Sequence, residues 1–424
     1  MQHVGVITLL ALRNLRRHLR RTLLTALAML VGGSLLIFSL SLGDGTHESW
    51  IDSGVRMGTG HVTIENPNFQ VSRKIEDRLS ADTRAAVESA LRAPGIAERV
   101  TVVSAKMIVR GLASSAAGAR PVQVIGVDPL AEVAFSTLDD QVVEGRYLEP
   151  DDGLAAYVGV DLVESLDLRV GSRLVLTAQD VNKDIAAQLV RVVGVFRSGV
   201  SAIDQSLVHV PRDTAGAWLG SGQDVTNVGM LVAESEEVPR LVSQLRARLA
   251  EPIDDGILRV IDWREAMPEL NAAVAIDDFG NYLIYGILFV IIGFGIVNTV
   301  LMSVLHRHRE FGLLQALGLS PRQTGALVLV EGLVLTAVSA VLAIGLGVFI
   351  TWYFWGDGLD FSSMMSNEMT FSGVVIDPVI IPLFRVARIV QALVFMLLVG
   401  GIASIYPAIR AATIDVSESM KFER

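Results

Sequence analysis

Side chains that could catalyse a reaction or bind a metal are scarce in this 424-residue chain. His47, His61 and His209 lack the HExxH spacing or the neighbouring ligands that would hold zinc. No Gly-rich loop ends in Lys-Ser or Lys-Thr to cradle a phosphate, and no G-x-S-x-G turn presents a nucleophilic serine. Cysteine is absent, which excludes thiolate chemistry and disulfides. The sequence therefore predicts no catalytic residue, no metal site and no cofactor in this chain.

One acid, Glu331, lies inside a long apolar stretch. Ionisable residues in such stretches are often functional, because an unpaired charge in hydrocarbon is costly. Glu331 lies only about two helical turns from the end of its stretch, where it could reach the membrane interface. We expect a structural anchor or a contact with a partner chain, and a proton-coupled role is the less favoured alternative.

Small residues recur at four-residue spacing in the same stretch, at Ser339, Ala343 and Gly347. Such a face lets another helix approach closely. The spacing indicates helix packing within the chain and leaves room for contact with a second copy or a homologue.

The elements that carry these residues are membrane spans. Hydrophobic residues make up 51% of the chain and charged residues 19%, which is too apolar for an ordinary soluble protein. A span needs roughly 20 mostly apolar residues. Four stretches qualify, and we expect a transmembrane helix in each: residues 23–43, 279–305, 323–356 and 389–406.

Lys and Arg in the short flanking segments set the orientation of the spans. They gather in a basic N-terminal helix at 1–22, in the connection 306–322 and in the tail 407–424, which are predicted to be cytoplasmic. Residues 44–278 and 357–388 then face outward. A cleaved signal peptide is the alternative for the N-terminus, but 23–43 is longer than a usual signal-peptide core.

Residues 44–278 are long enough for one or two domains. Strand and helix patterns predict an α+β sandwich at 60–132 and 226–265, interrupted by a mostly β subdomain at 133–225. The formal net charge of the chain is −10, and the excess acid lies in this region. An acidic domain does not favour nucleic acid or an anionic membrane surface.

The connection 306–322 carries a short amphipathic helix between two spans. Phe311, Leu314 and Leu317 recur at three-residue spacing, and Gly318 with Ser320-Pro321 ends the helix and starts the next span. Two interpretations remain open: a membrane-surface connector or a docking element.

Motifs along the whole chain resemble the FtsX-like permease superfamily of ABC transporters, of the MacB and LolC/LolE type. The matching segments are "RHREFGLLQALGLSPRQ", "EGLVLTAVSAVLAIGLG" and the tail "YPAIRAATIDVSESMKFE". The tail departs from the family pattern at Val416, Ser419 and Phe422. The resemblance implies a membrane α-helical protein with four transmembrane helices and a large α+β exocytoplasmic domain. This domain would have a porter-like fold with an inserted, mostly β, sabre-like subdomain.

The resemblance also implies that residues 306–322 form a coupling helix. It would dock into cytoplasmic ABC ATPase subunits, which bind the ATP and Mg. The residues that match the family's coupling motif are Arg309, Glu310, Phe311, Gly312, Leu314, Leu317 and Gly318.

Members similar to LolC/LolE extract lipoproteins from the bacterial inner membrane and pass them to a periplasmic carrier. We expect this role for a multi-pass inner-membrane permease with both termini in the cytoplasm, working with a second copy or a homologue. A MacB-like mechanical role in export is the alternative. A membrane-anchored sensor or a secondary transporter would need a signalling domain or paired intramembrane charges.

Overall fold

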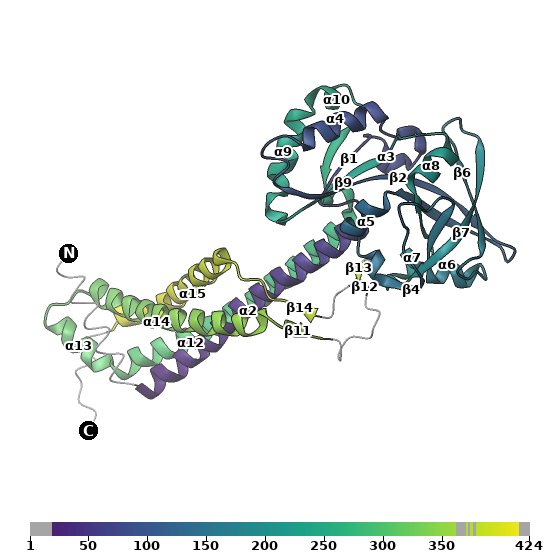
Figure 1. Cartoon of the computed structure of the whole chain (residues 1–424). Coiled ribbons are helices and arrows are strands. Elements are labelled where there is room, and N and C mark those ends of the chain that lie inside the picture. Colours follow the sequence, from purple (N-terminus) through teal and green to yellow (C-terminus); the bar gives the residue numbers. More distant parts are fainter. Residues whose placement is uncertain (1–18, 362–369, 372–373, 376–378, 415–424) are drawn as a thin grey trace. The chain divides into compact units, whose positions relative to one another are not determined.

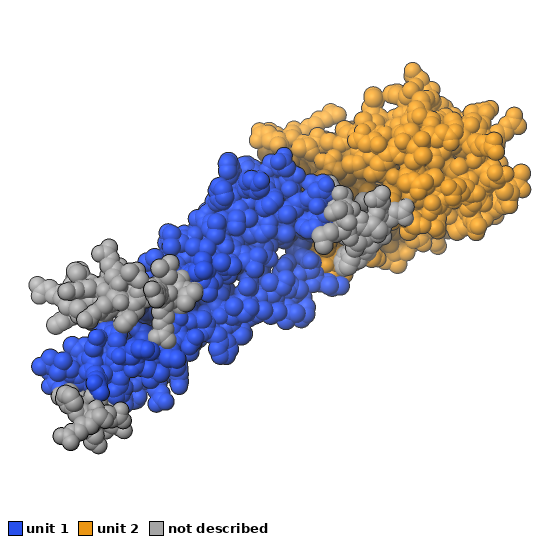
Figure 2. Space-filling model, turned by 90° about the horizontal axis from the view of Figure 1, so that it is seen from below, with its two compact units in different colours: residues 1–47, 276–361, 379–424 blue, residues 48–275, 362–378 orange. Residues whose placement is uncertain are grey.

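The computed structural model describes residues 19–361, 370–371, 374–375 and 379–414. The chain divides into two compact units, coloured separately in Figure 2. The membrane unit comprises residues 1–47, 276–361 and 379–424, and the β-rich unit comprises residues 48–275 and 362–378. Most of the predicted N-terminal helix at 1–22 lies outside the described residues.

The membrane unit is built on four helices that are long and apolar enough to span a bilayer, as predicted (Figure 1). Each exceeds the predicted span. The helices are α2 (Leu19–Met57), α12 (Pro268–His306), α14 (Pro321–Trp355) and α15 (Val386–Ala412), and α13 (His308–Ala316) connects α12 to α14.

Helix α2 is longer than a bilayer needs. It has 39 residues, whereas a span needs roughly 20, and its residues from Glu48 onward belong to the β-rich unit. We treat the charge-free stretch 23–43 as the spanning part, and residues from Asp44 onward as lying beyond it.

Helix α15 runs beyond Tyr406, the last residue of the predicted fourth span. It continues through Pro407 to Ala412. Proline removes one helical hydrogen bond, but Ala408 and Ala411 are buried after it, against α13 and α14. This packing carries the helix six residues further into the predicted tail, of which 415–424 lie outside the described residues.

Between α14 and α15 the described residues form short strand pairs. Strand β11 (Leu359–Asp360) pairs with β14 (Val379–Ile380), and β12 (Thr370–Phe371) pairs with β13 (Val374–Val375).

The first part of the β-rich unit is the predicted α+β sandwich. Its antiparallel strands lie in the order β10-β1-β9-β2, and α4 and α9 bury their apolar sides against them. Ser80 caps α4 by accepting a hydrogen bond from the Thr83 N–H. The elements are β1 (Val62–Glu65), α4 (Ala81–Leu91), β2 (Val100–Ser114), β9 (Asn227–Val232), α9 (Val238–Arg248) and β10 (Arg259–Asp262).

The second part is a closed barrel of six strands in the order β2-β3-β8-β5-β7-β6, with β6 returning to pair with β2. Alternate residues of every strand fill the interior. Gly111 lets the two closing strands meet, because a Cβ there would lie 2.4 Å from the Thr177 carbonyl oxygen. The strands added here are β3 (Ala119–Val127), β5 (Ala155–Gly159), β6 (Arg173–Gln179), β7 (Ile185–Phe196) and β8 (Leu207–Pro211).

The remaining helices and one strand, β4, lie around the sandwich and the barrel. The aromatic residues Phe69, Tyr157 and Phe196 pack outside the barrel in a separate core. The elements are α3 (Phe69–Ser72), α5 (Pro129–Phe135), β4 (Val142–Gly145), α6 (Val160–Ser165), α7 (Ser201–Asp204), α8 (Arg212–Leu219), α10 (Ala250–Asp254) and α11 (Trp263–Ala266).

The structure differs from the predicted insert at 133–225. Strand β2 pairs with β9 through residues 100–106 and with β3 from Met107 onward. The barrel therefore begins at 107, in the middle of a strand. A continuous apolar strand gives no local sign that its partners change.

Candidate coupling site

Helix α13 is a short, well-delimited element between two long helices. Gly318 follows it with φ +103°, a left-handed conformation that suits glycine. Ser320 then caps α14 by accepting from the Gln323 N–H, and the Gln323 side chain accepts from the Ser320 N–H. Helix α14 begins at Pro321, two residues before the predicted start of the third span at 323.

The predicted apolar face of α13 is divided in the structure. Phe311 has no exposed surface and packs among residues of α12, α14 and α15, with Gly312 buried beside it. Leu314 is half-buried, whereas Leu317 is 77% exposed. Phe311 thus anchors α13 to the other helices, and it is not available to a second protein in this conformation.

The free side of α13 carries different residues. Leu313 is 50% exposed, and Arg309, Ala316 and Leu317 are also exposed. Residues at spacings of three or four share one side of a helix, so these four form a continuous face. We call Arg309, Leu313, Ala316 and Leu317 the α13 face.

Arg307, at the N-terminus of α13, ties the helix to α14. Its Nη1 donates to both carboxylate oxygens of Glu331, at 3.1 and 2.9 Å, and its Nε donates to Glu310 Oε2 at 2.9 Å. The guanidinium carbon lies 4.8 Å from the centre of the Phe311 ring. Arg307 is 7% exposed and Glu331 13%. Glu331 thus has a partner within the chain, and its role as a structural anchor stays a prediction.

Sequence reasoning chose Arg309 and passed over Arg307. The i, i+3 spacing of Arg307 and Glu310 was the available signal. The sequence could not show the pair between Arg307 and Glu331, because Glu331 belongs to another helix and only the fold brings the two together.

We expect Arg307→Gln to lower the unfolding free energy of the membrane unit by about 3 kcal/mol, because it breaks a largely buried ion pair. Thermal unfolding of the full chain in detergent measures the change. Arg309→Gln, on the exposed face, is the control and should shift stability by less than about 0.5 kcal/mol. Equal effects of the two substitutions would contradict the anchor.

The small residues Ser339, Ala343 and Gly347 are buried, and Ala343 and Gly347 lie against α2 of the same chain. A Cβ on Gly347 would lie 2.9 Å from the Ile37 Cβ, and one on Gly33 would lie 2.8 Å from the Ala343 Cβ. The structure thus uses this face inside the bundle. Gly286 and Gly295 on α12, in contrast, have open space beside them.

Comparison with known proteins covers both units. Residues 22–248 match the family described as the MacB-like periplasmic core domain, and residues 282–416 match the FtsX-like permease C-terminal family.

Three relatives align over most of this chain. The lipoprotein-releasing system transmembrane protein LolC of Neisseria meningitidis serogroup B is 22% identical over 74% of this chain and 76% of its own length. The ABC transporter permease YknZ of Bacillus subtilis (strain 168) is 22% identical over 98% of both chains. The macrolide export ATP-binding/permease protein MacB of Bdellovibrio bacteriovorus is 23% identical over 95% of this chain and 59% of its own length.

The periplasmic-core match alone covers more than half of the chain, and the permease match covers α12 from residue 282 onward with all of α14 and α15. This chain therefore belongs to the FtsX-like permeases with a MacB-like periplasmic core domain, and it is an ABC transporter permease of the MacB and LolC type.

Proposed function

We propose that this permease couples ATP hydrolysis by a separate ABC ATPase to the release of lipoproteins from the bacterial inner membrane. The proposal of coupling rests on the difference between the two sides of α13. Phe311 and Arg307 are buried among the long helices, while the α13 face is exposed. A force applied to the free face reaches α12 and α14 directly.

ATP and Mg belong to the partner in this proposal. The sequence contains no phosphate-binding loop, whereas the MacB relative is by its name both ATP-binding and permease. The α13 face then docks to cytoplasmic ATPase subunits, which places α13 and both chain termini in the cytoplasm. Basic residues near the ends of the spans support this orientation.

The cargo is assigned by similarity. LolC is by name a lipoprotein-releasing transmembrane protein and aligns with three quarters of this chain. A lipoprotein leaves the membrane only when its acyl chains are withdrawn from the bilayer, at about 0.8 kcal/mol for each CH₂ group. ATP hydrolysis in the partner supplies this work, and a periplasmic carrier would receive the lipoprotein. The second reading, mechanical transmission in export of another substrate, is supported by the similarity to MacB.

We expect the double substitution Leu313→Glu/Leu317→Glu to weaken ATPase binding tenfold or more. Burial of one Leu side chain is worth about 1.5 to 3 kcal/mol, and the added charges make burial costly. The measurement is recovery of the ATPase with the affinity-tagged permease from detergent-solubilised membranes, followed by ATP-dependent release of an acylated lipoprotein from proteoliposomes. Leu189→Glu, an exposed leucine on β7, is the matched control.

The two readouts separate the parts of the proposal. Unchanged ATPase recovery with the double variant would reduce α13 to a connector. Normal ATPase recovery and turnover in the unaltered complex, with no lipoprotein release, would support the mechanical reading and reject the cargo. Phe311→Ala is a poor docking probe, because removing a buried Phe destabilises a protein by about 3 to 5 kcal/mol.

A further inference from the structure

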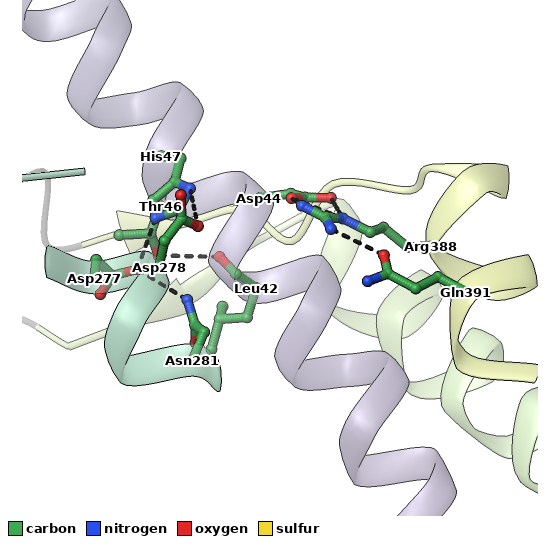
Figure 3. A network of polar contacts seen from close by, with 9 residues as sticks. All are labelled: Leu42, Asp44, Thr46, His47, Asp277, Asp278, Asn281, Arg388 and Gln391. Atoms are coloured by element: carbon green, nitrogen blue, oxygen red, sulfur yellow. Dashed lines mark hydrogen bonds and ion pairs between the residues drawn. The ribbon is translucent and has the colours of Figure 1, made fainter. Parts of the chain in front are cut away.

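One helical turn of α2, residues 44–47, carries ion pairs to two other helices of the membrane unit (Figure 3). Asp44 accepts from the Arg388 guanidinium of α15, with Arg388 Nε 2.8 Å from Asp44 Oδ2. His47 Nε2 lies 2.7 Å from Asp277 Oδ2 of α12. Residues 44 and 47 are one helical turn apart and share a side of α2, and Figure 3 shows that their partners come from two different helices. This turn of α2 is therefore tied to both α15 and α12.

The same turn is built for close approach. A Cβ on Gly45 would lie 2.0 Å from the Ile381 carbonyl oxygen, and the Leu383 N–H donates to the Ser41 carbonyl at 2.9 Å. Glycine inside a helix destabilises it by about 1 kcal/mol relative to alanine, yet here no side chain would fit. The segment after β14 thus runs directly against α2, beside the Asp44 pair.

The two pairs differ in how they respond to pH. Asp44 is 3% exposed, and its partner is an arginine, which stays charged at any pH of interest. His47 faces two carboxylates: besides Asp277, its Nδ1 lies 3.8 Å from Asp278 Oδ1. The hydrogen bond to Asp277 raises the pKa of His47, and the charges of Asp277, Asp278 and Asp44 act in the same direction against burial.

Water can reach the histidine. A cavity of about 30 Å³ lies between the helices, which is room for one or two water molecules. Its lining includes His47, Asp44 and Asp278 with the polar side chains Asn281 and Gln391; the charged and titratable groups completing it are Arg388, Tyr282 and Tyr285. Proton exchange at His47 therefore needs no prior opening of the helices.

We propose that Asp44–Arg388 and His47–Asp277 form a latch that holds α2 between α15 and α12, with a permanent arm at Asp44 and a pH-switched arm at His47. Below its pKa, His47 is charged: Nε2 donates to Asp277, and the positive ring lies in ion-pair range of Asp278. Above it, the pair with Asp277 falls to a single hydrogen bond from a neutral imidazole to the carboxylate, and the arm loosens. The latch is independent of the cargo and of ATPase docking.

Hydrogen exchange of residues 41–48, in the full chain in lipid nanodiscs, tests the latch. Rates from pH 6 to pH 9 are divided by the intrinsic exchange rates at each pH. We expect protection to rise by up to about fivefold as the pH falls through the His47 pKa, in line with a partly exposed ion pair. His47→Gln and Asp277→Asn should each abolish this pH dependence.

The permanent arm gives a second test. Arg388→Gln should lower protection about a hundredfold at every pH, because it leaves the buried Asp44 carboxylate without this partner. Arg388→Lys should restore part of the protection. His306→Gln, at the far end of α12, is the control and should leave the pH profile unchanged.

Three results would overturn the proposal: a flat profile in the unaltered chain, a profile that survives His47→Gln, or full protection in Arg388→Gln. None of these bears on lipoprotein release or on ATPase binding, so the latch and the proposed function fail separately.

Discussion

We expect Lys106→Met to lower the free energy of unfolding of the β-rich unit by about 3 to 5 kcal/mol, because it leaves the buried carboxylate of Glu132 without its counter-charge. Lys106 and Glu132 are 2% and 1% exposed, with Nζ and Oε1 2.8 Å apart. Ser104 Oγ donates to the other carboxylate oxygen at 2.8 Å, and Nζ lies 4.2 Å from the centre of the Phe135 ring. Burial would raise the pKa of Glu132, but Lys106, His209 and the hydrogen bonds lower it overall.

Urea unfolding of the full chain in detergent, followed by tryptophan fluorescence, measures the loss. The double variant Lys106→Met/Glu132→Leu should recover most of it, since an apolar pair avoids the desolvation of both charges. Lys183→Met removes an exposed pair with Glu76 and should cost less than about 1 kcal/mol. A loss below 1 kcal/mol for Lys106→Met would show that water reaches Glu132.

Acid weakens the β-rich unit through His209, and we expect about 2 kcal/mol of stability to be lost between pH 7 and pH 5. His209 lies in β8, 2% exposed, and burial lowers its pKa to about 4. In the unfolded chain histidine titrates near 6.5. Between these values only the unfolded chain takes up the proton, so the contribution is complete above about pH 6.5 and is lost as the pH falls toward 4.

The measurement is urea unfolding at pH 7, 6 and 5. His209→Gln should flatten the dependence of stability on pH, because glutamine does not titrate. Glutamine can also keep a hydrogen bond to Tyr147, whose hydroxyl lies 3.2 Å from His209 Nδ1. His61 is also buried with a lowered pKa, so His61→Gln should remove a separate part of the slope. A slope that is unchanged in His209→Gln would contradict the assignment.

The spans and most strands of this fold were predictable because their signal is local. A long charge-free stretch such as 279–305 is stable only in the hydrocarbon of a membrane. Alternation of side-chain types in 100–109 indicates a strand, whichever strand it pairs with. Barrel closure was not predictable. Strand β6 pairs with β2 across some sixty residues, and no property of either strand specifies the other.

The candidate site shows a different limit. Periodicity placed Phe311 and Leu314 in one helix, with Leu317 directly after its last residue. It could not distinguish the side of α13 that faces α12 and α14 from the exposed side. At a membrane surface both sides can be apolar, so the hydrophobic pattern loses its usual meaning. Lys106 was missed for the opposite reason: a lone lysine in a strand normally indicates solvent, and only the fold brings Glu132 to it.

Strand β2 has a consequence for protein engineering and for the exchange of parts between relatives. One unbroken strand, β2, is both the edge strand of the sandwich and a strand of the barrel. A cut in a surface loop therefore cannot separate the sandwich from the barrel. A chimaera that grafts the barrel of a relative at 133 and 225 would divide a hydrogen-bonded ladder and strand β3 would remain from the wrong parent. A working graft must carry residues from 107 onward and match the register of β2 at Lys106. The unbroken backbone of β2 therefore limits where two such permeases can be recombined, although the sequence shows no boundary there.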